Sequence, residues 1–203
     1  MRIRAIRPLG LALACALALP ALPALAHADH AHPQKSVETG RGLVEVKLTD
    51  TALVDQSGRT RKLKSDVLAD RVTVVNFVYT TCTTICPVSS ALFAELQERL
   101  GAQLGKEVQL LSISVDPQRD TPAQLRAYAS KVGSRAGWTW LTGRKDAVDG
   151  VLKSFGAYNT RPEDHPPMLM IGDAHSGKWT RMYGFPSISD VLAEVNQRVA
   201  ECA

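Results

Sequence analysis

Regular alternation between short apolar runs and helix-like apolar stripes constrains this 203-residue chain more than any other feature. Residues 72–78 (VTVVNFV) and 108–115 (VQLLSISV) are nearly continuous apolar runs rich in β-branched residues, which predicts two buried strands. Between them, residues 87–100 repeat apolar side chains at helical spacing, with Pro87 suited to a first turn. Strands that alternate with helices predict a sheet with a parallel middle and helices on both faces.

The same alternation continues to the C-terminus. Thr121 followed by Pro122 predicts a helix start, and Gly133 predicts its end. The remaining predicted elements are a hairpin at 53–60 with Ser-Gly at the turn, strands at 138–141, 168–171 and 178–182, and helices at 148–155 and 188–199. From the first buried strand, the order β-α-β-α-β-α-β-β-α fits a thioredoxin-like α/β fold with an extra helix, a central mixed sheet and one domain over residues 38–203.

The first 26 residues have the layout of a secretory signal peptide. Three arginines precede an apolar run at 9–19, and small residues follow, with cleavage predicted after Ala26 or Ala28. Cleavage predicts a periplasmic protein without a stable membrane anchor. An uncleaved anchor is the alternative, although the apolar run is shorter than the roughly 20 residues that a span needs.

Charge and composition argue against nucleic acid as a partner. The chain carries a net charge of +4, and the three arginines of the predicted signal account for most of it. No basic run remains after cleavage. Residues 27–37 form a polar lead-in, predicted to be disordered, in which His27, His30 and His32 suggest either a loose metal site or, preferably, a solvated tail.

Three of the four cysteines remain after removal of the predicted signal, a number that is too small, and odd, for a disulfide framework. Cys15 lies inside the predicted signal, where it does not fit a lipoprotein site, and Cys202 is interpreted as a small buried apolar residue. Cys82 and Cys86 share the loop between a buried strand and the next helix, whose N-terminus favours thiolates. Thiolates are metal ligands and redox nucleophiles, so both uses stay open beside a plain disulfide or simple core packing.

Two thiolates are soft donors that suit copper and also bind zinc, and a stable site needs a third ligand. His165 lies in the loop before the strand at 168–171, which faces the cysteine loop in thioredoxin-like folds. We therefore predict His165 as the third ligand, with a surface loop histidine as the alternative. Structural roles are expected for the other notable side chains, which are Asp116 and Asp120 in turns, Trp138, Trp140, Met168 and Met170 mainly in the core, and His175 on the surface.

Three segments in order, NFVYTTCTTICP (76–87), SVDPQRDTP (114–122) and DHPPMLMI (164–171), resemble the Sco/SenC family of copper proteins. The resemblance extends from about residue 40 to the C-terminus. It implies that Cys82, Cys86 and His165 bind a copper ion, for delivery to the dinuclear copper site of cytochrome c oxidase subunit two or another copper acceptor. Pro166-Pro167 stands where a Ser or Thr usually follows the histidine, which stiffens the ligand loop.

Three functions fit these residues, and the first is preferred. A metallochaperone would bind copper through the reduced dithiol and His165, and would need a thiol reductant. A thiol-disulfide oxidoreductase would reduce the cysteines of a partner protein through Cys82 and Cys86 and would not need His165. A peroxiredoxin-like peroxidase fits less well, because no arginine lies beside Cys82 in the sequence. Whether the chain is an enzyme is thus left open.

Overall fold

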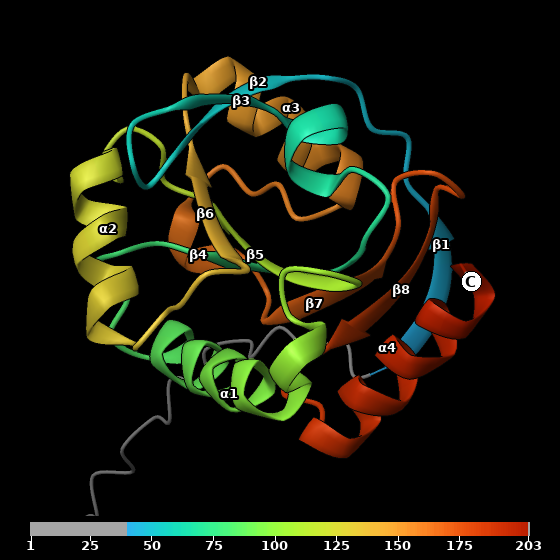
Figure 1. Ribbon diagram of the computed structural model, residues 1–203. Coiled ribbons are helices and arrows are strands. Elements are labelled where there is room, and N and C mark those ends of the chain that lie inside the picture. Colours follow the sequence, from blue (N-terminus) through green and yellow to red (C-terminus); the bar gives the residue numbers. More distant parts are fainter. Residues whose placement is uncertain (1–39, 203) are drawn as a thin grey trace, which may run out of the picture. The chain divides into compact units, whose positions relative to one another are not determined.

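The computed structural model describes residues 40–202, which form one eight-stranded mixed sheet (Figure 1). The strand order is β1-β8-β7-β4-β5-β6-β2-β3. Its centre is parallel and consists of β4 (Val72–Val78), β5 (Val108–Ser114) and β6 (Trp138–Thr142). The antiparallel strands on either side are β1 (Arg41–Glu45), β2 (Ala52–Asp55), β3 (Thr60–Lys62), β7 (Met168–Gly172) and β8 (Lys178–Tyr183).

Helices cover both faces of the sheet, as the alternating pattern predicts. One core cluster packs under α1 (Ile85–Leu100), α2 (Pro122–Lys131) and α4 (Ile188–Cys202). The other packs under α3 (Lys145–Phe155) and a π-helix at Leu63–Leu68. Short 3-10 turns occur at Gly101–Gln103 and Pro162–Asp164. The predicted thioredoxin-like mixed sheet is confirmed.

Several local predictions are also confirmed. Helix α2 begins with a capping box. The Thr121 hydroxyl oxygen accepts a hydrogen bond from the Gln124 backbone N–H, and the Gln124 side-chain oxygen accepts one from the Thr121 backbone N–H. Trp138 and Trp140 are buried and stacked, with ring centroids 4.9 Å apart. Met168 and Met170 are buried, and His175 is exposed.

Two predictions about apolar side chains are wrong. The apolar residues at helical spacing within 87–100 include Val88, which that pattern predicts to be buried, but Val88 is 51% exposed. The buried face of α1 instead contains Cys86, Phe93 and Leu96, because the helix starts at Ile85 and Cys86 points into the core. Cys202, in the last turn of α4, is exposed rather than buried, since this helix packs into the core through Val191 and Val195, nearer its start.

The predicted signal peptide (residues 1–26) and the histidine-containing lead-in lie outside the described residues. Within residues 40–202, no helix combines the length and apolar character needed to cross a bilayer.

Candidate functional site

Strand β4 delivers the two cysteines to one end of the sheet. All seven of its residues are buried, and the chain turns immediately after it, where the Cys82 N–H donates to the Tyr79 carbonyl at 3.1 Å. Helix α1 then begins at Ile85, so Cys82 lies in the loop and Cys86 in the first helical turn. A strand-to-helix loop at the carboxyl end of parallel strands is where α/β folds commonly bind ligands.

The sulfur of Cys82 takes the place of a helix cap. Thr84, the N-cap residue of α1, makes no capping hydrogen bond with its side chain, and Pro87 has no N–H to satisfy. The Cys86 N–H donates instead to Cys82 Sγ at 3.3 Å. A thiolate is favoured in this position, because the free N–H groups of a helix start carry partial positive charge.

Both thiols are free and buried, but their acidities differ. Burial raises the pKa of Cys82, yet hydrogen bonds from the Cys86 thiol and from backbone N–H groups outweigh it, so the net pKa is lowered. Burial and the neighbouring Cys82 sulfur raise the pKa of Cys86 strongly. Of the two thiols, Cys82 is therefore the one that loses its proton more readily.

A buried carboxylate anchors the cysteine loop from the other side. Asp120 accepts hydrogen bonds from the Thr80 N–H at 3.0 Å, the Thr80 hydroxyl at 2.6 Å and the Ser114 hydroxyl at 2.6 Å. Burial raises the pKa of Asp120, opposed by these hydrogen bonds. Asp116 instead pairs with the exposed Arg119 at 2.9 Å. The two aspartates thus have positioning and turn roles, consistent with the structural expectation from the sequence.

His165 is buried, and both of its ring nitrogens face backbone carbonyl oxygens. Nδ1 lies 2.6 Å from the Pro162 oxygen and Nε2 lies 3.2 Å from the Phe77 oxygen. A neutral imidazole has one N–H and one lone pair, so it can donate to only one of them. We assign the N–H to the shorter Nδ1 contact, which leaves the Nε2 lone pair facing an oxygen that it cannot bond.

Tyr79 lies between His165 and the cysteines. Its ring meets the His165 ring edge-on, with centroids 5.9 Å apart, and its hydroxyl interacts with the Cys82 thiol. Burial, followed by that hydrogen bond, raises the pKa of Tyr79 to about 12. The tyrosine is therefore a neutral donor that links the two parts of the candidate site.

The structure brings Cys82 and Cys86 together, but it does not assemble a three-ligand cluster. Within residues 40–202, no three His, Cys, Asp or Glu side chains lie close enough to hold a metal ion. His165 is on the correct loop, next to Tyr79, but its Nε2 faces the Phe77 carbonyl oxygen at 3.2 Å rather than the sulfurs. A three-ligand site would therefore require His165 to leave that carbonyl.

Sequence reasoning missed the roles of Tyr79 and Asp120. Tyr79 precedes the cysteine loop directly, so a polar aromatic residue at the end of a buried strand was an available signal. Asp120 was assigned to its own turn, because nothing in the sequence links it to Thr80, forty residues earlier.

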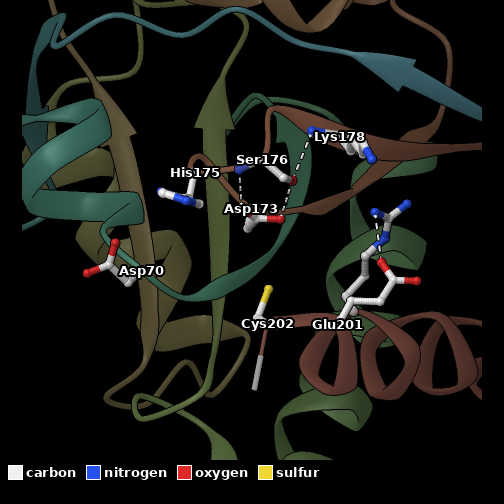
Figure 2. Close-up of a pocket in the computed structure, with 8 residues that line it drawn as sticks. Asp70, Asp173, His175, Ser176, Lys178, Glu201 and Cys202 are labelled. Carbon is white, nitrogen blue, oxygen red and sulfur yellow. Dashed lines mark hydrogen bonds and ion pairs between the residues drawn. The ribbon is translucent and has the colours of Figure 1, made fainter.

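A second group of candidate ligands lies near the opposite end of β4 (Figure 2). Cys202, His175 and several charged side chains line a cavity of about 580 Å³ there. The Asp173 carboxylate is already used by the Ser176 N–H and hydroxyl, and Glu201 pairs with Arg198 at 3.5 Å. These carboxylates hold a turn and a helix end.

A thioredoxin-like domain with a reduced cysteine pair at the start of α1 defines the class of this protein. The family described as SCO1/SenC matches residues 47–180. The chain belongs to that family.

Individual relatives agree with this assignment. The chain is 37% identical to the SCO1 protein homolog of Bacillus subtilis over 57% of its own length and 60% of the relative's length. It is 34% identical to a Stutzerimonas stutzeri protein named for copper binding, over 72% of this chain and 67% of that one. The matched region thus spans about two thirds or less of these relatives.

Solved structures show the same fold. The structure of BsSco, described as a Sco-family cytochrome c oxidase assembly protein with a disulfide switch, superposes with a TM-score of 0.66 at 27% identity. That match covers 78% of this chain and 96% of BsSco. The copper-bound ScoI of Bradyrhizobium japonicum gives a TM-score of 0.60 at 24% identity over 75% of this chain and 99% of ScoI, which supports the fold alone.

Proposed function

We propose that this protein is an exported copper metallochaperone that carries one copper ion on Cys82, Cys86 and His165. The observation that carries the proposal is the reduced, buried cysteine pair at the start of α1, where the Cys86 N–H already supports a negative charge on Cys82. Two thiolates and an imidazole are a soft donor set suited to copper. Membership of the SCO1/SenC family supports the same metal.

The surroundings of His165 support its role as the third ligand. Nδ1 is held by the Pro162 carbonyl, the kind of contact that orients metal-binding imidazoles. The Nε2 lone pair gains nothing from the Phe77 oxygen, so binding copper would replace a poor contact with a good one. The Tyr79 ring, edge-on to the imidazole, would have to shift as His165 approaches the sulfurs.

Delivery follows from ligand exchange. A thiolate of the acceptor replaces one cysteine sulfur at a time on the copper ion, so transfer requires the reduced dithiol and a partner with its own thiols. We propose the dinuclear copper site of cytochrome c oxidase subunit two as the acceptor, since the relative BsSco is described as a cytochrome c oxidase assembly protein. A periplasmic thiol reductant would keep the pair ready, after removal of the signal peptide at residues 1–26.

The second candidate function is a thiol-disulfide oxidoreductase acting on a partner's cysteines. The unequal acidity of the two thiols favours it, because Cys82 has the lowered pKa of an attacking thiol and Cys86 is a nearby resolving thiol. This activity would not use His165.

Copper titration of the reduced full chain separates the two functions. Wild type and His165→Ala are compared by metal content after dialysis, with His175→Ala as the matched control, because His175 is exposed at the other end of β4. The metallochaperone proposal expects one retained copper in wild type and the control, and a loss of affinity of at least about tenfold in His165→Ala. Equal retention in all three proteins would favour the oxidoreductase.

A further inference from the structure

A groove of about 480 Å³ opens beside Cys82 between α1 and α2. Its walls combine the loop residues Thr80, Thr81 and Thr83 with one face of each helix. His165 and Tyr79 do not line it, so the groove reaches Cys82 without passing the proposed third ligand. An approaching molecule could therefore contact Cys82 without displacing His165.

The groove lies where α1 faces the C-terminal part of α2 and the turn that follows it. The Ser90 hydroxyl lies 3.4 Å from the Tyr128 hydroxyl, and farther along, the Gln97 side chain donates to the Gly133 carbonyl at 3.1 Å. Ala91 and Ala94 line the α1 side, where larger side chains would close the space. The hollow thus follows from small residues on one helix face.

The chemistry changes along the groove. Cys82 lies at one end, and Lys131, in the last turn of α2, lines the other. Within the described part of the chain, the Lys131 ammonium makes no ion pair. Helix α2 begins beside the cysteine loop, since Asp120 just before it accepts from the Thr80 N–H. Its ten residues from Pro122 to Lys131 give nine steps that rise about 14 Å, which equals about four residues of extended peptide.

We propose that this groove docks an extended segment of the copper acceptor, with its cysteine at Cys82 and a carboxylate about four residues away at Lys131. This inference rests on the proposed metallochaperone function. The acceptor thiol gives up its proton, its sulfur bonds to copper, and the Cys82–copper bond breaks as Cys82 takes a proton. No electron is gained or lost.

Activated peptides test the docking step without copper. Each peptide has one cysteine, present as its disulfide with thionitrobenzoate, and glutamate or lysine four residues away on either side. The protein is the full chain with serine at Cys15, Cys86 and Cys202. The Cys82 thiolate attacks the peptide sulfur, a Cys82–peptide disulfide forms, and thionitrobenzoate leaves, so its release gives the rate.

The charge at Lys131 supplies the first readout. The glutamate peptide is expected to react about fivefold faster than the lysine peptide, the upper range for one exposed ion pair. Lys131→Glu should invert this preference, while Lys106→Glu, an exposed lysine that does not line the groove, should leave it unchanged. Absence of inversion in Lys131→Glu would overturn the proposal.

The shape of the groove supplies the second readout. Ala91→Trp fills the hollow and should slow the glutamate peptide about tenfold. Val88→Trp, on the same helix but outside the groove, should react like the parent. A small symmetrical aryl disulfide should react equally with all variants, which shows that Cys82 is intact. Parent-like peptide rates in Ala91→Trp would contradict docking here.

Copper binding separates failure of this proposal from failure of the proposed function. If the otherwise wild-type chain retains copper but the peptides ignore Lys131 and Ala91, docking alone is wrong. If the wild-type chain retains no copper, the metallochaperone proposal fails. A preference for the glutamate peptide would then mean that the groove binds the substrate of a thiol-disulfide oxidoreductase.

Discussion

The two ends of β4 carry similar side chains, but only one end favours a thiolate. Cys82 lies at the N-terminus of α1 and accepts the Cys86 N–H, and hydrogen bonds lower its pKa in spite of burial. Cys202 lies in the last turn of α4, near Asp173 and Glu201 (Figure 2). Although it is exposed, partial desolvation and the charges of these two carboxylates raise its pKa. The comparison teaches that candidate ligands lying close together are not enough. A cysteine beside a histidine and carboxylates suits a soft metal only where its surroundings also favour the thiolate.

The largest expected effect comes from removing the thiols at each end of β4. Cys82→Ser with Cys86→Ser should lower copper affinity at least about hundredfold, since even outer partners of metal ligands contribute tenfold to hundredfold. Cys202→Ser should bind copper like wild type. Competition with a copper chelator of known affinity measures both. A loss of affinity in Cys202→Ser would place copper at the wrong end of β4.

The next test compares the buried carboxylates that hold each end. Asp120→Ala leaves the Thr80 N–H without its partner and should cost about 2 kcal/mol of unfolding free energy. Asp173→Ala removes the acceptor of the Ser176 N–H and should cost a similar amount. Urea unfolding measures both losses. Only Asp120→Ala should also weaken copper binding; equal copper binding in the two variants would mean that Asp120 does not position the loop.

Thiol alkylation compares the two ends directly. The lowered pKa of Cys82 and the raised pKa of Cys202 predict that Cys82 reacts with iodoacetamide faster than Cys202 at pH 7.5, because the thiolate is the reacting form. As pH rises, Cys82 should reach its maximal rate first. Exposure acts in the opposite sense, since Cys202 is exposed and Cys82 is buried. Peptide mass mapping gives both rates, and faster labelling of Cys202 at pH 7.5 would contradict the account.

The smallest expected effect concerns Tyr79. Tyr79→Phe removes a hydroxyl that interacts with Cys82, so the Cys82 thiolate loses a donor and its pKa should rise. Alkylation of Cys82 should slow about threefold to fivefold, equivalent to about 1 kcal/mol for one hydrogen bond. Tyr158→Phe, packed beside Lys153 on α3, is the control. Identical Cys82 alkylation rates in Tyr79→Phe and Tyr158→Phe would show that the Tyr79 hydroxyl does not support the Cys82 thiolate.

Strong local signals explain what the sequence predicted well. The continuous apolar runs of β4 and β5 and the Thr121-Pro122 helix start depend on nearby residues, and each appears in the structure. Strand β1 was missed because its residues are mostly exposed and its pairing with β8 joins distant parts of the chain. The link between Asp120 and Thr80 is equally non-local.

The candidate site was predictable in its parts but not in its arrangement. The short separation of Cys82 and Cys86 places both at one helix start. The ring contacts of His165 depend on the Phe77 carbonyl, on a strand far away in sequence, and no local pattern indicates them. The exposure of Cys202 depends on which residues cover the end of α4.

X-ray absorption spectroscopy of the copper-loaded, reduced full chain tests the central claim most directly. The account predicts two sulfur ligands and one imidazole nitrogen on copper, unchanged in Cys202→Ser, with the imidazole signal lost in His165→Ala. A spectrum that loses a sulfur ligand in Cys202→Ser, or keeps its imidazole in His165→Ala, would contradict the assignment of copper to Cys82, Cys86 and His165.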